Sequence, residues 1–95
     1  MGIHNFINAQ KMAIKYPDTF KAPTIKKLSQ IKQDDFIKVC LNDERFWVKV
    51  IEVDEDEIRG EVDNHLFESQ PFNIHDIIAC KKEHVYSIMK GDEQE

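Results

Sequence analysis

The sequence has few glycines and no long apolar run, and each shortage excludes a class of protein. Only Gly2, Gly60 and Gly91 occur, so no glycine-rich phosphate-binding loop is expected. No apolar stretch approaches the length of a membrane span, and no apolar run follows basic residues at the N-terminus as in a signal peptide. We therefore expect a cytoplasmic protein that does not bind membranes.

Cysteine and histidine are also sparse. Cys40 and Cys80 each lie in an apolar run, which favours reduced packing thiols over a disulfide between them. The four histidines lie at no zinc-like spacing from a cysteine or from one another. His75-Asp76 resembles half of a catalytic triad, but adjacent strand residues point to opposite faces and no nucleophile is placed beside them. We expect no metal, no cofactor and no catalytic residue.

The 95 residues suffice for one domain, and their formal net charge is −5. Residues 1–45 carry eight Lys or Arg against five Asp or Glu, whereas residues 46–95 carry five against thirteen. This balance argues against a basic surface over the whole domain, as a nucleic-acid-binding protein would have. A local basic segment remains, formed by Lys21, Lys26, Lys27 and Lys32. It is interpreted as a solvated face or, alternatively, as a patch for an acidic partner.

Helical periodicity is confined to the first third of the chain. The stretch HNFINAQKMAIKYP (residues 4–17) predicts a helix that ends before Pro17. Its apolar stripe consists of Phe6, Ala9, Ala13 and Tyr16, widened by Ile3, Ile7 and Ile14. A second, short helix is expected in TIKKLSQI, capped by Thr24 and with Ile25, Leu28 and Ile31 on one side.

From residue 35 onward the apolar residues alternate, which predicts short strands whose interior is filled by Phe46, Val48, Val50, Ile58 and Val62. We expect them at residues 36–42, 45–53, 58–64, 77–80 and 85–89, with turns at Asn42-Asp43 and at an acidic hairpin, residues 54–57. Gly60 predicts a bulge or a close backbone approach. The expected fold is α+β, with an N-terminal helix and a short helix packed on a strongly bent antiparallel sheet, or an SH3-like barrel, of about five strands. It forms one domain, residues 1–95, divided into a helical segment (1–31), a β domain (35–89) and an acidic tail (90–95).

The middle of the chain resembles domain-of-unknown-function family 2314 and the related family 2185, which are small bacterial SH3-like proteins. The shared pattern is matched by Glu44, Arg45, Trp47, Val48, Val50, Ile58, Gly60, Val62 and Asn64. The resemblance extends over residues 31–88, but Gln33 or Asp34 and also His75 stand where turn glycines are usual, and Gln70-Pro71 interrupts a loop. It implies an SH3-like fold and no particular chemistry.

Arg45 and Trp47 lie two residues apart, so on a strand they share a face. They could form a stacked cationic and aromatic pair, or Trp47 could be a packing residue under the N-terminal helix. Together with Arg59, Asn64 and Phe67 they form our predicted contact surface for a protein partner, although a turn role is the simpler interpretation of Asn64. The sequence thus favours a non-catalytic protein- or peptide-binding module. The alternative is weak nucleic-acid binding through Lys21–Lys32.

Overall fold

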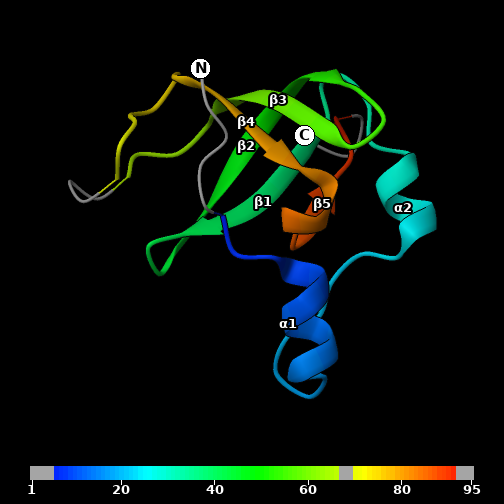
Figure 1. Cartoon of the computed structure of the whole chain (residues 1–95). Coiled ribbons are helices and arrows are strands. Elements are labelled where there is room, and N and C mark those ends of the chain that lie inside the picture. Colours follow the sequence, from blue (N-terminus) through cyan, green and yellow to red (C-terminus); the bar gives the residue numbers. More distant parts are fainter. Residues whose placement is uncertain (1–5, 67–69, 92–95) are drawn as a thin grey trace.

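The computed structural model describes residues 6–66 and 70–91, and it shows an α+β protein with two helices and one five-stranded antiparallel sheet (Figure 1). The elements are α1 (Ala9–Lys15), α2 (Ile25–Ser29), β1 (Phe36–Leu41), β2 (Glu44–Val53), β3 (Glu57–Val62), β4 (Ile77–Lys81), the 3₁₀ turn η1 (Lys82–His84) and β5 (Ser87–Met89). The strand order is β4-β3-β2-β1-β5. Within the described residues no pairing joins β4 to β5, so the sheet is not closed. Neither helix is long and apolar enough to cross a membrane.

One face of the sheet forms the core, and the predicted alternation is confirmed. The five residues expected inside are at most 1% exposed, and they are Phe46, Val48, Val50, Ile58 and Val62. Three residues of β1 join the same cluster, namely Ile37, Val39 and Leu41. Burial of this apolar surface is the main force that holds the three central strands together.

The N-terminal helix is shorter than predicted. Residues 6–8 are not helical, and the Ile7 N–H donates to the Cys40 carbonyl at 3.0 Å, so this segment continues alongside β1. The helix begins after Asn8 because the Asn8 side chain accepts the Lys11 N–H. Phe6 is thereby released from the helix and packs in the core against Phe46 and Phe72.

Part of the predicted helical stripe is also wrong. Ile14 and Ile25 are 82% and 81% exposed, although both were expected to face the core. Each helix has one to two turns and reaches the domain at a single buried side chain, Ala9 in α1 and Leu28 in α2. The predicted Thr24 cap of α2 is confirmed, since its side chain accepts the Lys27 N–H.

Gly60 lies where two backbones approach closely, as predicted. A Cβ atom at this position would lie 2.5 Å from the Lys49 carbonyl oxygen and 2.5 Å from Cγ1 of Val48. The register of β2 against β3 shifts between Val50 and Glu52, directly beside the Gly60 pair. The missing side chain thus lets β3 pass against β2 at this irregularity.

The same four-residue turn leads into both β1 and β4. In residues 32–35 and again in residues 73–76, the fourth residue is an aspartate whose carboxylate accepts the N–H of the first. The third residue, Asp34 or His75, has a φ of 75° in both turns. Glycine adopts such a φ more readily than any other residue, so each turn holds an L-residue in a backbone conformation that favours glycine.

Asp35, the last residue of the first turn, is fully buried. Its carboxylate accepts hydrogen bonds from the Lys32 N–H at 3.0 Å, the Lys90 ammonium at 2.9 Å and the Gly91 N–H at 3.1 Å. Burial alone would raise the pKa of this carboxyl, but the three donors outweigh burial and hold the pKa below its usual value. Asp35 thus ties both the start of β1 and the residues after β5 to one point.

Replacing a left-handed residue by glycine should stabilise the fold. An L-residue with positive φ is strained by about 1–2 kcal/mol, and glycine relieves this strain. Glycine also makes the unfolded chain more flexible, which offsets about 0.5–1 kcal/mol of the stabilisation. We expect Asp34→Gly and His75→Gly each to raise the free energy of unfolding by roughly 0.5–1 kcal/mol, measured by urea denaturation. Gln33→Gly, in the same turn without positive φ, is the control and should destabilise. Equal losses in all three variants would contradict the assigned turn geometry.

Candidate functional site

The outer face of the sheet carries the two residues that the sequence singled out. Arg45 and Trp47 both project away from the core, and they pair across to Cys40 and Lys38 of β1. They do not stack on each other. The Lys38 ammonium lies 4.9 Å from the Trp47 ring centroid, and Trp47 itself is half-buried. Helix α1 packs chiefly against η1.

The Arg45 guanidinium lies over two other aromatic rings, those of Tyr86 and Phe20. Its guanidinium carbon lies 4.9 Å from the Tyr86 centroid and 5.6 Å from the Phe20 centroid, and these two rings are 6.2 Å apart. Tyr86 belongs to a small apolar cluster with Ala9 and Cys40, against which Phe20 packs. This cluster anchors the connector between the helices on the outer face of the sheet.

Two neighbouring hollows lie beside these rings. The first, of about 270 Å³, is lined by Thr19, Phe20, Lys21, Lys38, Arg45, Tyr86 and Ser87. The second, of about 280 Å³, is lined by Lys21, Ala22, Pro23, Lys27, Tyr86, Ser87 and Ile88. Lys21, Tyr86 and Ser87 line both. We name the two hollows together the cationic–aromatic cleft. Among the residues that the structure describes, four cations and no acidic residue line it, in a chain of net charge −5.

Burial disfavours the ionised forms of the thiols and of the phenol near the cleft. Burial raises the pKa of the Cys40 thiol, although Arg45 opposes this effect. Burial also raises the pKa of the Tyr86 hydroxyl. Cys80 lies in the main core, where burial raises its pKa to about 12. Activation of a thiol or phenol as a nucleophile requires the opposite shift.

The other predicted contact residues lie apart from the cleft. Arg59 is exposed and forms an ion pair with Glu52, and it lines a separate hollow together with Lys32. The Asn64 side chain accepts the Trp47 N–H of β2, so its oxygen is engaged within the fold. Phe67 lies outside the described residues.

The four lysines of the basic segment also lie on different surfaces. Lys21 and Lys27 line the cleft, whereas Lys32 lies beside Asp34 and Asp35 in another hollow. Lys26 lines neither hollow. Sequence reasoning did not predict Lys38 or Tyr86 as site residues. In the register of the first hairpin Lys38 lies opposite Trp47, and this pairing could have indicated Lys38 as a site residue. Nothing near Tyr86 in the sequence indicates that Tyr86 belongs to the site.

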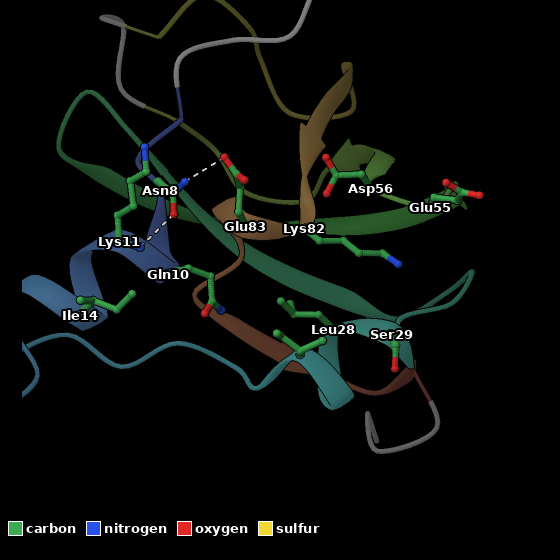
Figure 2. A pocket seen from close by; sticks show the side chains of 11 residues that line it. Asn8, Gln10, Lys11, Ile14, Leu28, Ser29, Glu55, Asp56, Lys82 and Glu83 are labelled. Carbon is green, nitrogen blue, oxygen red and sulfur yellow. Dashed lines mark hydrogen bonds between the residues drawn. The ribbon is translucent and has the colours of Figure 1, made fainter.

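Another hollow, of about 550 Å³, lies between α1, α2, η1 and the tip of the β2–β3 hairpin (Figure 2). Its charged side chains have both signs, with Lys11 and Lys82 against Glu55, Asp56 and Glu83. Figure 2 shows the Asn8 amide donating to Glu83, which ties α1 to η1 at 2.8 Å. With mixed charge and none of the predicted contact residues, this groove does not select a ligand class.

His84 packs against Phe6 of the N-terminal segment. It is buried, its ring lies 5.8 Å from that of Phe6, and its Nδ1 accepts the Lys81 N–H at 3.1 Å. Burial lowers the pKa of His84, so the folded protein holds it neutral near pH 7. His75 differs, because it is exposed and lies against Glu61 instead of Asp76. The half-triad interpretation is therefore not supported.

Comparison with known proteins adds no relative. No protein-family model matches the chain, and neither the curated proteins nor the solved structures include a match. The site is therefore argued from its geometry alone.

His84 should make stability depend on pH on the acid side of neutrality. Because its pKa is lower in the folded than in the unfolded chain, the unfolded chain binds more protons as pH falls below 6.5. The free energy of unfolding should therefore decrease as the pH falls from 6.5 toward the pKa of His84 in the folded protein. The substitution His84→Gln should weaken this decrease. Urea denaturation at pH 7.5 and 5.5 measures the effect, with exposed His75→Gln as the control. A decrease of equal size in all three proteins would exclude His84 as its source.

Proposed function

We propose that the chain is a non-catalytic binding module that takes a segment of another protein into the cationic–aromatic cleft. The observation that supports this most is the charge of the cleft, which among the described residues is lined by four cations and no acidic residue in an acidic chain. Two of these cations, Lys38 and Arg45, lie over aromatic rings that orient them, and Arg and Tyr are among the residues that dominate binding energy at protein interfaces.

The proposal includes an SH3-like architecture, because the chain crosses from one sheet edge to the other in very few residues. In a flat sheet β4 and β5 would lie about 19 Å apart, with strands about 4.8 Å from each other. The link from Lys81 to Ser87 includes the three-residue η1 turn, which rises only about 2 Å per residue. A link this short requires the sheet to curl so that its edges approach, as in a small open barrel.

The proposal also places the protein in a reducing compartment, the cytoplasm. Cys40 and Cys80 are free and lie in two different apolar clusters. Neither needs oxidation to complete the fold, which is typical of cytoplasmic proteins.

Nucleic-acid binding is the alternative, and one feature favours it: the cleft combines aromatic rings and cations, as single-strand-binding grooves do. Two features weigh against it. The net charge of −5 repels phosphate, and the basic segment is divided between two surfaces.

Two double variants separate these functions, since they remove the same charge from different places. Lys21→Ala/Lys38→Ala alters the cleft, and Lys26→Ala/Lys32→Ala alters lysines outside it. Immobilised on beads and exposed to nuclease-treated cell lysate, the wild type and the Lys26/Lys32 variant should retain the same protein, and the cleft variant at least tenfold less. Fluorescence of Trp47, the only tryptophan, then measures the affinity of the purified partner.

Two outcomes contradict the proposal. Identical protein recovery by all three chains would show that the cleft is not the binding surface. Retention of nucleic acid from untreated lysate, lost equally in both double variants, would establish the alternative.

A further inference from the structure

Among the described residues, β5 is an edge strand that pairs only with β1. Leu41 and Glu44 flank the two-residue turn of the first hairpin, so they form a hydrogen-bonded pair. By alternation, the odd residues of β1 direct their backbone groups to β2 and the even residues direct theirs to β5. The Cys40 carbonyl confirms this parity, because it accepts the Ile7 N–H on the β5 side.

The same parity identifies the open position on β5. Lys38 pairs with Ser87 and Phe36 pairs with Met89, so those two residues of β5 face β1. Ile88, between them, directs its N–H and C=O away from the sheet. No backbone hydrogen bond joins β5 to residues 19–23 of the connector, all of which are described. Ile88 also lines the cleft.

We propose that the partner segment is an extended acidic peptide that adds to the β5 edge as a sixth strand. This inference rests on the proposed function and specifies its ligand and binding mode. Ile88 exchanges two backbone hydrogen bonds with the peptide, as in other strand-addition complexes. An acidic side chain of the peptide reaches the Arg45 guanidinium, whose fork geometry suits a carboxylate. Lys21, which lines both halves of the cleft, supplies a second charge along the same path.

Because β5 is short, most of the affinity for the peptide must come from the cations of the cleft. With three residues in β5, Ile88 alone offers outward groups, so backbone pairing by itself gives little affinity. The cations add attraction and select against basic peptides. Binding should therefore weaken with salt, as expected for partly exposed charge pairs.

The test uses the full chain and defined probes, read out by Trp47 fluorescence. The probes are an acetylated, amidated hexapeptide of alternating Glu and Val, its Lys-Val counterpart, and an eight-nucleotide oligo(dT). We expect the Glu-Val peptide to bind at least tenfold more tightly than the other two. Two further peptides carry methyl groups on the backbone nitrogens of either the Glu or the Val residues. They distinguish strand addition from binding through side chains alone, because in an added strand only one of the two sets of N–H groups faces β5. One methylated peptide should lose at least tenfold in affinity and the other should stay within threefold.

The protein variants are matched in chemistry. Arg45→Ala should reduce affinity for the Glu-Val peptide at least tenfold, and exposed Arg59→Ala should leave it within threefold. Because Arg45 also packs on Phe20, Lys21→Ala provides a second cleft variant whose side chain is exposed.

The outcomes distinguish this inference from the function on which it rests. If both methylated peptides bind like the parent, strand addition is wrong while binding in the cleft stands. If the Lys-Val peptide binds as well as the Glu-Val peptide, or neither binds, acidic recognition is wrong. If oligo(dT) binds and the peptides do not, the inference and the proposed function both fail.

Discussion

The buried carboxylate of Asp35 is the interaction on which the rest of the structure depends. It accepts hydrogen bonds from Lys32, before β1, and from Lys90 and Gly91, after β5, while its own backbone carbonyl accepts the Val50 N–H. Hydrogen bonds to charged groups contribute about 1.5–3 kcal/mol each, and an unpaired buried carboxylate is costly. These contacts hold the end of the chain, and with it the three-residue β5, against β1.

The position of β5 in turn creates the candidate site. Tyr86, just before β5, supplies the ring under Arg45, and Ser87 and Ile88 form one wall of the cleft. The opposite wall is the connector between the helices, which Phe20 fastens to the sheet. Asn8 and Phe6, just before α1, contact Glu83 and His84 of η1. Asp35 does not line the cleft, but by holding β5 in place it supports one wall of the cleft.

The sequence predicted the strands well because burial on one face leaves a period of two that few other structures produce. It also predicted the Thr24 cap and the close approach at Gly60, which are local effects. It failed where tertiary contacts decide, as at Phe6, which leaves the helical stripe for the core, and at Ile14. The cleft joins Lys21, Arg45 and Tyr86, whose proximity depends on how the connector folds back. One signal was available for Asp35, since its turn has the same form as residues 73–76.

Residue-by-residue hydrogen exchange of the free protein near pH 7 tests the account most directly, because its claims concern individual N–H groups. The amides of Lys32 and Gly91 should be protected, and that of Ile88 should exchange freely. In Asp35→Asn, the protection of Lys32 and Gly91 should fall at least tenfold relative to Val62, whose N–H bonds to Asp76. Unchanged protection of Lys32 and Gly91 in this variant, or a protected Ile88 in the free wild type, would contradict the account.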